Sequence, residues 1–90
     1  MTSKDNIDDD ELSKMCDIVE NTLESIVIQF RGHFFEEGME NKLRSQFESR
    51  LSILLERKGS DFKNLSNSQI EYIDTRISKA LDLFKKEYES

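Results

Sequence analysis

Apolar residues recur every three to four positions along most of the chain, which is the spacing of one face of an α-helix. A first stripe comprises Leu12, Met15, Cys16, Val19, Leu23, Ile26, Val27 and Phe30. Ile18 and Ile28 lie off that line, so the apolar band is wide, and we expect contacts on more than one side of it. The pattern predicts a helix over about residues 8–37, with Asn21 and Gly32 as points where it could break.

Two further stripes follow along the chain. The second comprises Leu43, Phe47, Leu51, Leu54 and Leu55, and the third Ile70, Ile73, Ile77, Ala80, Leu81 and Phe84. They predict helices over about residues 39–58 and 67–88, joined by a linker over residues 59–66. Residues 1–7 are polar apart from the first and last, and we expect them to be loose.

Acidic residues and glycines along the chain indicate where these helices begin and end. An acidic run from Asp8 to Glu11 suits a helix N-terminus, where free backbone N–H groups and the helix dipole favour negative charge. Gly38 is expected in the left-handed position just past the end of the first helix, with Met39 closing the cap, and the second stripe stops before Gly59.

The third helix has two candidate N-terminal caps. Ser68 followed by Glu71 fits the capping box, and Ser66 with Gln69 is the alternative. Because the chain has no proline and only three glycines, little else interrupts the helical pattern. The prediction is therefore a single all-α domain over residues 1–90, with three to four amphipathic helices in a small open bundle or helical hairpin array.

Charge and composition narrow the classes of partner and compartment. The net charge is −6, which disfavours direct binding to nucleic acid. No apolar run approaches the ~20 residues of a membrane span, and the N-terminus lacks a signal-peptide pattern. A lone cysteine excludes an internal disulfide and favours a reducing compartment, either nuclear or cytoplasmic. A basic stretch, which is either a solvated face or a dock for an acidic partner, comprises Lys42, Arg44, Arg50, Arg57, Lys58 and Lys63.

Candidate catalytic and metal-binding chemistry is sparse. His33 is the only histidine, and Cys16 is the only strong nucleophile. They lie 17 positions apart, about 25 Å along a straight helix, which excludes a catalytic pair unless the helix folds back. We interpret Cys16 as a small core residue and expect no enzyme activity, no metal site and no cofactor.

An aromatic cluster around Phe30, Phe34, Phe35 and Met39 is the strongest candidate site. It belongs either to the protein's own core or to a surface that closes on a partner helix. We expect the partner-binding residues to be Ile26, Phe30, Phe34, Phe35, Met39, Leu43 and Phe47.

The stretch from Arg31 to Leu43, RGHFFEEGMENKL, resembles the helix–glycine–helix centre of the enhancer-of-yellow-two type transcription and mRNA-export factors. These are subunits of the SAGA deubiquitinase module and the TREX-two complex. Residues 19–21 resemble the point where the first helix of that family breaks at a glycine, and residues 65–68 together with the helix expected after them resemble its final capped helix. The resemblance implies a nuclear adaptor without enzymatic activity, whose helices wrap around one long helix of a scaffold protein.

The predicted function is that of a non-enzymatic helical module for protein–protein interaction, which the resemblance would place in a transcription-coactivator or mRNA-export complex. The alternative is a small self-associating regulator of phage or bacterial type, which binds and modulates another protein. The expected partner is accordingly either another protein, through a long helix, or a second copy of the chain in a homodimer.

Overall fold

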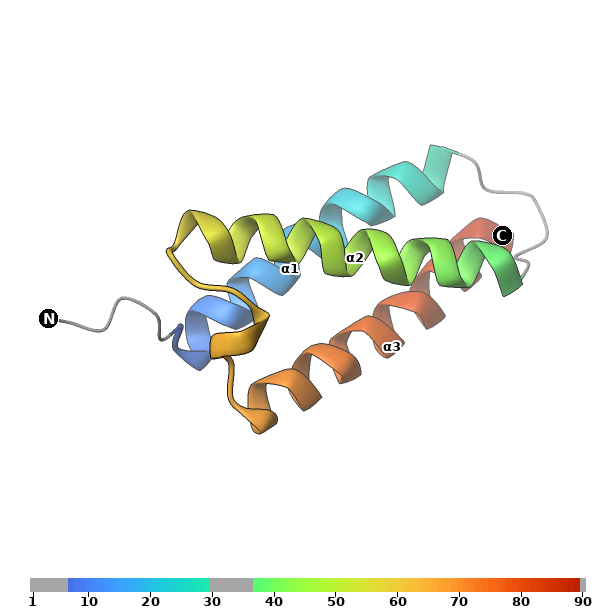
Figure 1. Cartoon of the computed structure of the whole chain (residues 1–90). Coiled ribbons are helices and arrows are strands. Elements are labelled where there is room, and N and C mark those ends of the chain that lie inside the picture. The colour runs from blue at the N-terminus through green and yellow to red at the C-terminus, as the bar shows by residue number, and fades with distance from the viewer. Residues whose placement is uncertain (1–6, 30–36, 90) are drawn as a thin grey trace, which may run out of the picture.

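The computed structural model of the chain describes residues 7–29 and 37–89, which form an all-α bundle (Figure 1). Its elements are α1 (Asp9–Gln29), α2 (Glu37–Arg57), a 3₁₀ helix η1 (Phe62–Asn64) and α3 (Asn67–Glu89). The second and third helices lie close to their predicted ranges. The first described helix ends at Gln29, and the rest of its predicted range up to Glu36 lies outside the described residues.

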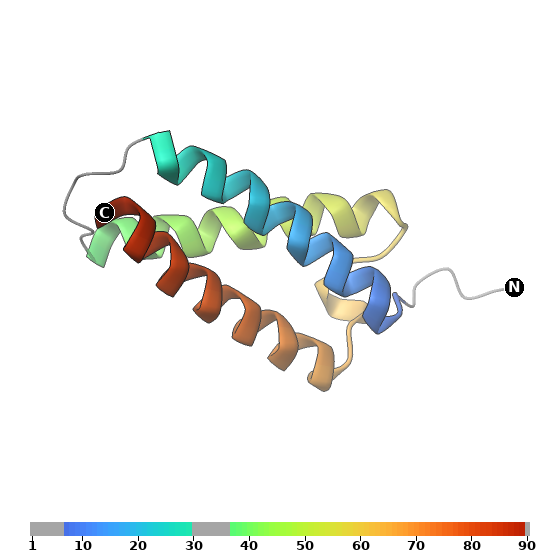
Figure 2. The same ribbon diagram turned by 180° about the vertical axis from the view of Figure 1, so that it is seen from behind.

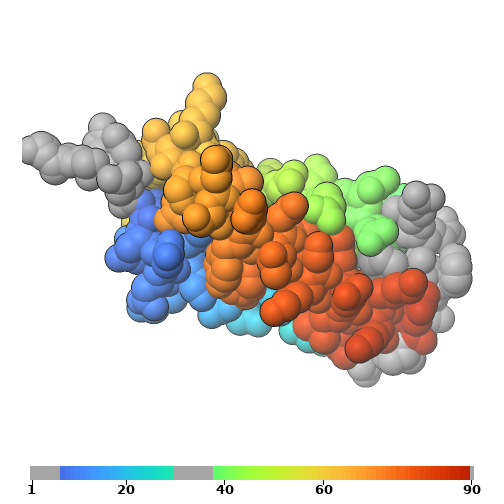
Figure 3. Space-filling view, turned by 90° about the horizontal axis from the view of Figure 1, so that it is seen from below, coloured from blue at the N-terminus to red at the C-terminus, as the bar shows by residue number. Residues whose placement is uncertain are grey.

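The helices pack in an up–down–up arrangement. α2 runs antiparallel to α1, and α3 returns antiparallel to α2, so that α1 and α3 run parallel (Figures 1 and 2). Seen from below, α3 stretches along one face of the molecule, with the first turns of α1 beside it (Figure 3). α1 therefore has a neighbour on two sides, as its wide apolar band indicated.

The acidic run starts α1 as predicted. The Asp8 side chain caps the helix by accepting a hydrogen bond from the Glu11 backbone N–H at 2.8 Å. The expectation of a loose segment through residue 7 is wrong for Ile7, whose side chain is buried in the core. α1 also continues through Asn21 without a break, because several residues on both sides of it pack into the core. The other candidate break, Gly32, lies outside the described residues.

The predicted boundary at Gly38 is wrong, because α2 already begins at Glu37 and Gly38 lies in its first turn. Among the described residues, the glycine with positive φ is Gly59, at 79°. There the Gly59 N–H donates to the Glu56 carbonyl at 3.0 Å, and the Ser60 N–H donates to the Leu55 carbonyl at 2.9 Å. This pair of bonds is the Schellman motif, which ends α2.

The start of α3 uses the alternative capping box. The Ser66 N–H donates to Gln69 Oε1 at 3.0 Å, and the Gln69 N–H donates to Ser66 Oγ at 3.2 Å. The preferred box at Ser68 is wrong, because Ser68 already lies inside the helix. Gln69 Nε2 also donates to the Ile7 carbonyl at 2.7 Å and to Asp9 Oδ1 at 3.2 Å. The Gln69 amide thus joins the beginnings of α1 and α3.

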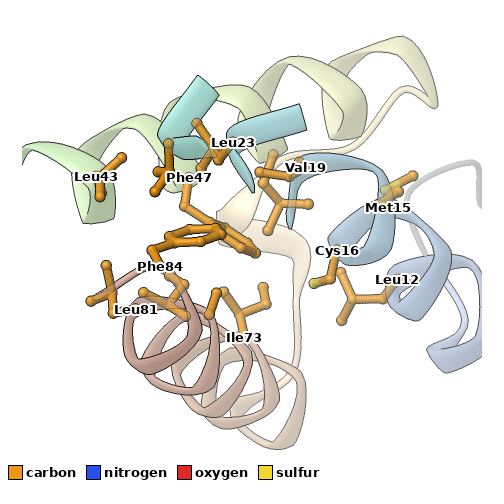
Figure 4. Packing of buried hydrophobic residues seen from close by; sticks show 14 of the residues in the cluster. Leu12, Met15, Cys16, Val19, Leu23, Leu43, Phe47, Ile73, Leu81 and Phe84 are labelled. Atoms are coloured by element: carbon orange, nitrogen blue, oxygen red, sulfur yellow. The ribbon is translucent and has the colours of Figure 1, made fainter. Parts of the chain in front are cut away.

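Side chains from all three helices fill a common core (Figure 4). Phe47 of α2 and Phe84 of α3 point into its centre and are 1% and 0% exposed. Cys16 is also 0% exposed, which confirms that it is a core residue. The buried apolar set comprises Ile7, Leu12, Met15, Cys16, Val19, Leu23, Val27, Leu43, Phe47, Leu51, Leu55, Ile73, Ile77, Ala80, Leu81, Phe84 and Tyr88.

Arg76 of α3 forms hydrogen bonds with α1. Its Nη2 donates to Asp17 Oδ1 at 2.6 Å and to Glu20 Oε1 at 3.2 Å, and its Nη1 donates to the Tyr72 hydroxyl at 2.9 Å and reaches the Ser13 carbonyl at 3.5 Å. Burial lowers the pKa of Arg76, but these hydrogen bonds outweigh it and raise the pKa above the ordinary arginine value. A charged group held by several acceptors across two helices fixes their relative register.

The two described glycines should respond oppositely to alanine. Nothing lies within 4 Å of the position a Cβ would take at Gly38, so Gly38→Ala should raise the free energy of unfolding by about 0.5 kcal/mol. Gly59→Ala should lower it by about 1–2 kcal/mol, because its φ is positive. Urea titrations followed by circular dichroism would measure both changes, and a loss of stability in Gly38→Ala would contradict this start of α2.

Arg76→Ala should lower the free energy of unfolding by about 1–3 kcal/mol, because it leaves the half-buried Glu20 carboxylate without its hydrogen bond. Arg44→Ala is the matched control. Arg44 also reaches a carboxylate on another helix, Asp74 at 3.5 Å, but both side chains are more exposed, so the expected loss is below about 0.5 kcal/mol. Equal losses in the same urea titration would contradict the role given to Arg76.

Candidate functional site

The surface along α1 and α2 contains two hollows, which together form what we call the α1–α2 groove; Tyr88 of α3 also borders the first hollow. The first hollow has a volume of about 330 Å³ and is lined by Leu23, Ile26, Val27, Met39, Lys42, Leu43, Gln46, Arg50 and Tyr88. The second has a volume of about 230 Å³ and is lined by Ile18, Val19, Thr22, Arg50, Ile53, Leu54 and Arg57. Arg50 lines both, so the two hollows follow one another along the same pair of helices.

Helical periodicity explains why these residues border one groove. Ile18, Thr22 and Ile26 are four residues apart on α1 and therefore form a row beside the core stripe. α2 contributes a matching row at spacings of three and four. Its members are Lys42, Gln46, Arg50, Ile53 and Arg57. Because the helices are antiparallel, the end of one row faces the beginning of the other.

Large aliphatic side chains remain exposed along the groove. Ile18 and Ile53, which face the second hollow from opposite helices, are 54% and 50% exposed. Ile26 at the first hollow is 38% exposed. Single exposed apolar residues are ordinary, but several along one concave surface indicate a binding site.

The groove also carries basic side chains that have no ion-pair partner among the described residues. Within the described parts of the chain, Lys42, Arg50 and Arg57 form no ion pair. Arg50 Nε is buried and has no hydrogen-bond acceptor. Other members of the basic stretch are occupied: Arg44 pairs with Asp74 at 3.5 Å, and Lys58 with Glu11 at 3.4 Å. Some residues of the basic stretch therefore form ion pairs within the bundle, whereas Lys42, Arg50 and Arg57 give the groove positive charge that no described carboxylate neutralises.

The structure brings three of the predicted partner-binding residues together, since Ile26, Met39 and Leu43 all line the first hollow. Phe47 lies in the core, 1% exposed, because the second stripe points its centre inward. It therefore has almost no surface to offer a partner. The predicted site residues Phe30, Phe34 and Phe35 lie outside the described residues.

Sequence reasoning missed the second hollow. Ile18 was noticed only as an addition to the first stripe, and Ile53 was not singled out. The signal that could have found them is an isoleucine one position off a core stripe on each of two adjacent helices. Arg50 was part of the basic stretch, but nothing in the sequence separates it from Arg44, which is paired.

The described residues carry no feature typical of a metal site or of a membrane span. No group of three or more potential metal ligands occurs among residues 7–29 and 37–89. None of the helices there combines the length and apolarity that crossing a bilayer requires. His33 lies outside these ranges, so its separation from Cys16 stays a prediction.

Burial raises the pKa of the Cys16 thiol from 9.0 to about 11, a shift that the Arg76 charge partly opposes. At mildly alkaline pH the native protein should hold about 100-fold less thiolate than the unfolded chain, so alkylation by iodoacetamide should be strongly slowed until denaturant is added. Equal alkylation rates in native and denaturing buffer would contradict the burial of this thiol.

The same shift predicts a pH dependence of stability. Because the folded-state pKa is the higher one, the contribution is constant below about pH 9 and is lost as the pH rises towards 11. Cys16→Ala should lose this part of the alkaline decline in urea titrations. If the free energy of unfolding of the wild-type protein and of Cys16→Ala fell equally between pH 9 and 11, this prediction would be contradicted.

Comparison with known proteins gives no relative from which a function could be transferred: no family model, no curated protein and no solved structure matches the chain.

Proposed function

We propose that the protein is a non-enzymatic module for protein–protein interaction that binds a helix of its partner in the α1–α2 groove. The observation that carries the proposal is the pair of hollows bordered by exposed isoleucines. The exposed isoleucines Ile18, Ile26 and Ile53 lie outside the buried core that the three helices share, so their surface is not needed to hold the helices together. Burying it on a partner would remove it from water.

The shape of the groove supports a helical partner. Two packed antiparallel helices present a long furrow between their side-chain ridges, and a third helix can lay its own ridge into such a furrow. Helix-in-groove recognition typically uses apolar anchors at positions i, i+3 or i+4, and i+7. The succession of two hollows on one pair of helices fits that spacing.

The charge of the groove favours a different protein over a second copy. A twofold dimer through this face would place the same patch on both sides. The basic row of one copy, which contains Lys42, Arg50 and Arg57, would then face the same basic row of the other copy, and each chain carries a net charge of −6. The charge of this surface therefore supports a separate partner, and we rank the self-associating regulator second.

The resemblance to the enhancer-of-yellow-two type factors adds a finer proposal, a nuclear adaptor in a transcription-coactivator or mRNA-export assembly. Its support is the residue pattern from Arg31 to Leu43. The described bundle differs from a wrapping adaptor in two respects: α1 runs unbroken through Asn21, and the helices enclose one another's apolar faces. We therefore propose that any scaffold helix binds outside the bundle, in the groove.

The groove proposal is tested by affinity purification from cell extract with wild-type protein, Ile53→Asp and Ile70→Asp, followed by quantitative mass spectrometry. Ile53 and Ile70 are 50% and 41% exposed, but only Ile53 lies in the groove. A partner should be retained by Ile70→Asp and reduced at least about tenfold with Ile53→Asp, because a charge would enter the apolar seam. Melting curves by circular dichroism should be similar for both variants.

A common set of captured proteins for all three baits would overturn the groove as the binding site. Loss of the same proteins from both variants would also count against it, since that result assigns binding to general surface apolarity. Sedimentation of the purified chain addresses the second candidate, which requires a concentration-dependent dimer that Ile53→Asp dissociates.

A further inference from the structure

We infer that the helix bound in the α1–α2 groove is acidic, and that it places a carboxylate between two large apolar side chains so that this carboxylate binds the guanidinium of Arg50. The inference rests on the proposed function and goes further, because it names the partner's chemistry. It follows from the position of Arg50, from the spacing of the hollows and from the charges at the two ends of the groove.

Arg50 is positioned as a receptor for an anion. It lines both hollows, its Nε is buried without an acceptor, and within the described residues it has no ion pair. The other arginines that face a neighbouring helix, Arg44 and Arg76, both reach carboxylates there. A buried donor of a charged group left without an acceptor is unfavourable, so a carboxylate brought by a partner would supply the hydrogen-bond acceptor that the described residues do not provide.

The hollows set the spacing of the partner's anchors. On α2, Gln46 lines the first hollow and Ile53 the second, seven residues or about 10 Å apart along the helix axis. Arg50 lies between them. A partner helix that fills both hollows therefore needs apolar side chains about two turns apart, with the carboxylate near the turn between them. Positions i, i+4 and i+7 lie on one face of a helix and meet this requirement.

The ends of the groove carry the same sign of charge. Lys42 lies at the first hollow and Arg57 at the second, on either side of Arg50, and both side chains are exposed. Acidic residues that flank the anchors would meet these cations across the rim. Exposed charges contribute mainly to the rate of association and to its salt dependence, whereas the partly buried Arg50 should determine specificity.

The test uses alanine-based helical peptides stapled to keep them helical, with leucines at i and i+7 and glutamate, glutamine or lysine at i+4. Isothermal titration calorimetry would measure their binding to the full chain. The glutamate peptide should bind at least about tenfold more tightly than the glutamine peptide, and the lysine peptide should bind most weakly. Arg50→Gln should remove the preference for glutamate, whereas the control Arg44→Gln should keep it.

A charge swap separates recognition by Arg50 from a general effect on folding. Arg50→Glu should bind the lysine peptide better than the glutamate peptide, which a merely structural role of Arg50 would not produce. Equal affinities of the three peptides for the wild-type chain would overturn the carboxylate inference while leaving the groove proposal intact. Absence of binding by all three, or binding that Ile53→Asp does not weaken, would overturn the groove proposal itself.

Discussion

The parallel register of α1 and α3 is the constraint on which the rest of the bundle depends. Successive helices pack antiparallel with little difficulty, but α1 and α3 are brought side by side only after α2 has returned the chain to its starting end. Two polar groups fix them there: the Gln69 amide at their beginnings and the Arg76 guanidinium nearer the middle. Apolar stripes alone tolerate sliding, whereas such directional bonds have one favourable alignment.

This arrangement also determines where the apolar surface of α1 goes. One side of its wide band packs with α2 and α3 in the core, and the adjacent row from Ile18 to Ile26 remains beside α2 at the surface. α2 carries basic residues opposite that row. Among them, Arg50 is only partly buried and has no acidic partner within the described residues. The protein can therefore keep a stable core and still present a surface with both apolar and electrostatic preferences. A partner selected by this surface must satisfy both at once.

The features that the sequence predicted well are the local ones. The three stripes and the helix start at the acidic run over residues 8–11 depend on residues within a few positions of each other, so periodicity and the preference for acidic residues at helix N-termini were sufficient. Gly38 was misjudged because a helix start and a helix end both accept glycine, and only the backbone conformation distinguishes them. One of the two hollows could be predicted in part, because Ile26, Met39 and Leu43 were expected to bind a partner and all three line it. The role of Arg50 could not, because it depends on which acidic side chains come within reach after folding.

Because three helices traverse the bundle, α1 begins at one end of it and α3 finishes at the opposite end (Figure 1). α3 alone covers about 34 Å at 1.5 Å per residue. Joining these two points to make a circular permutant would need at least about 10 extended residues. The fold is consequently ill-suited to insertion within a loop of another domain, which requires neighbouring ends.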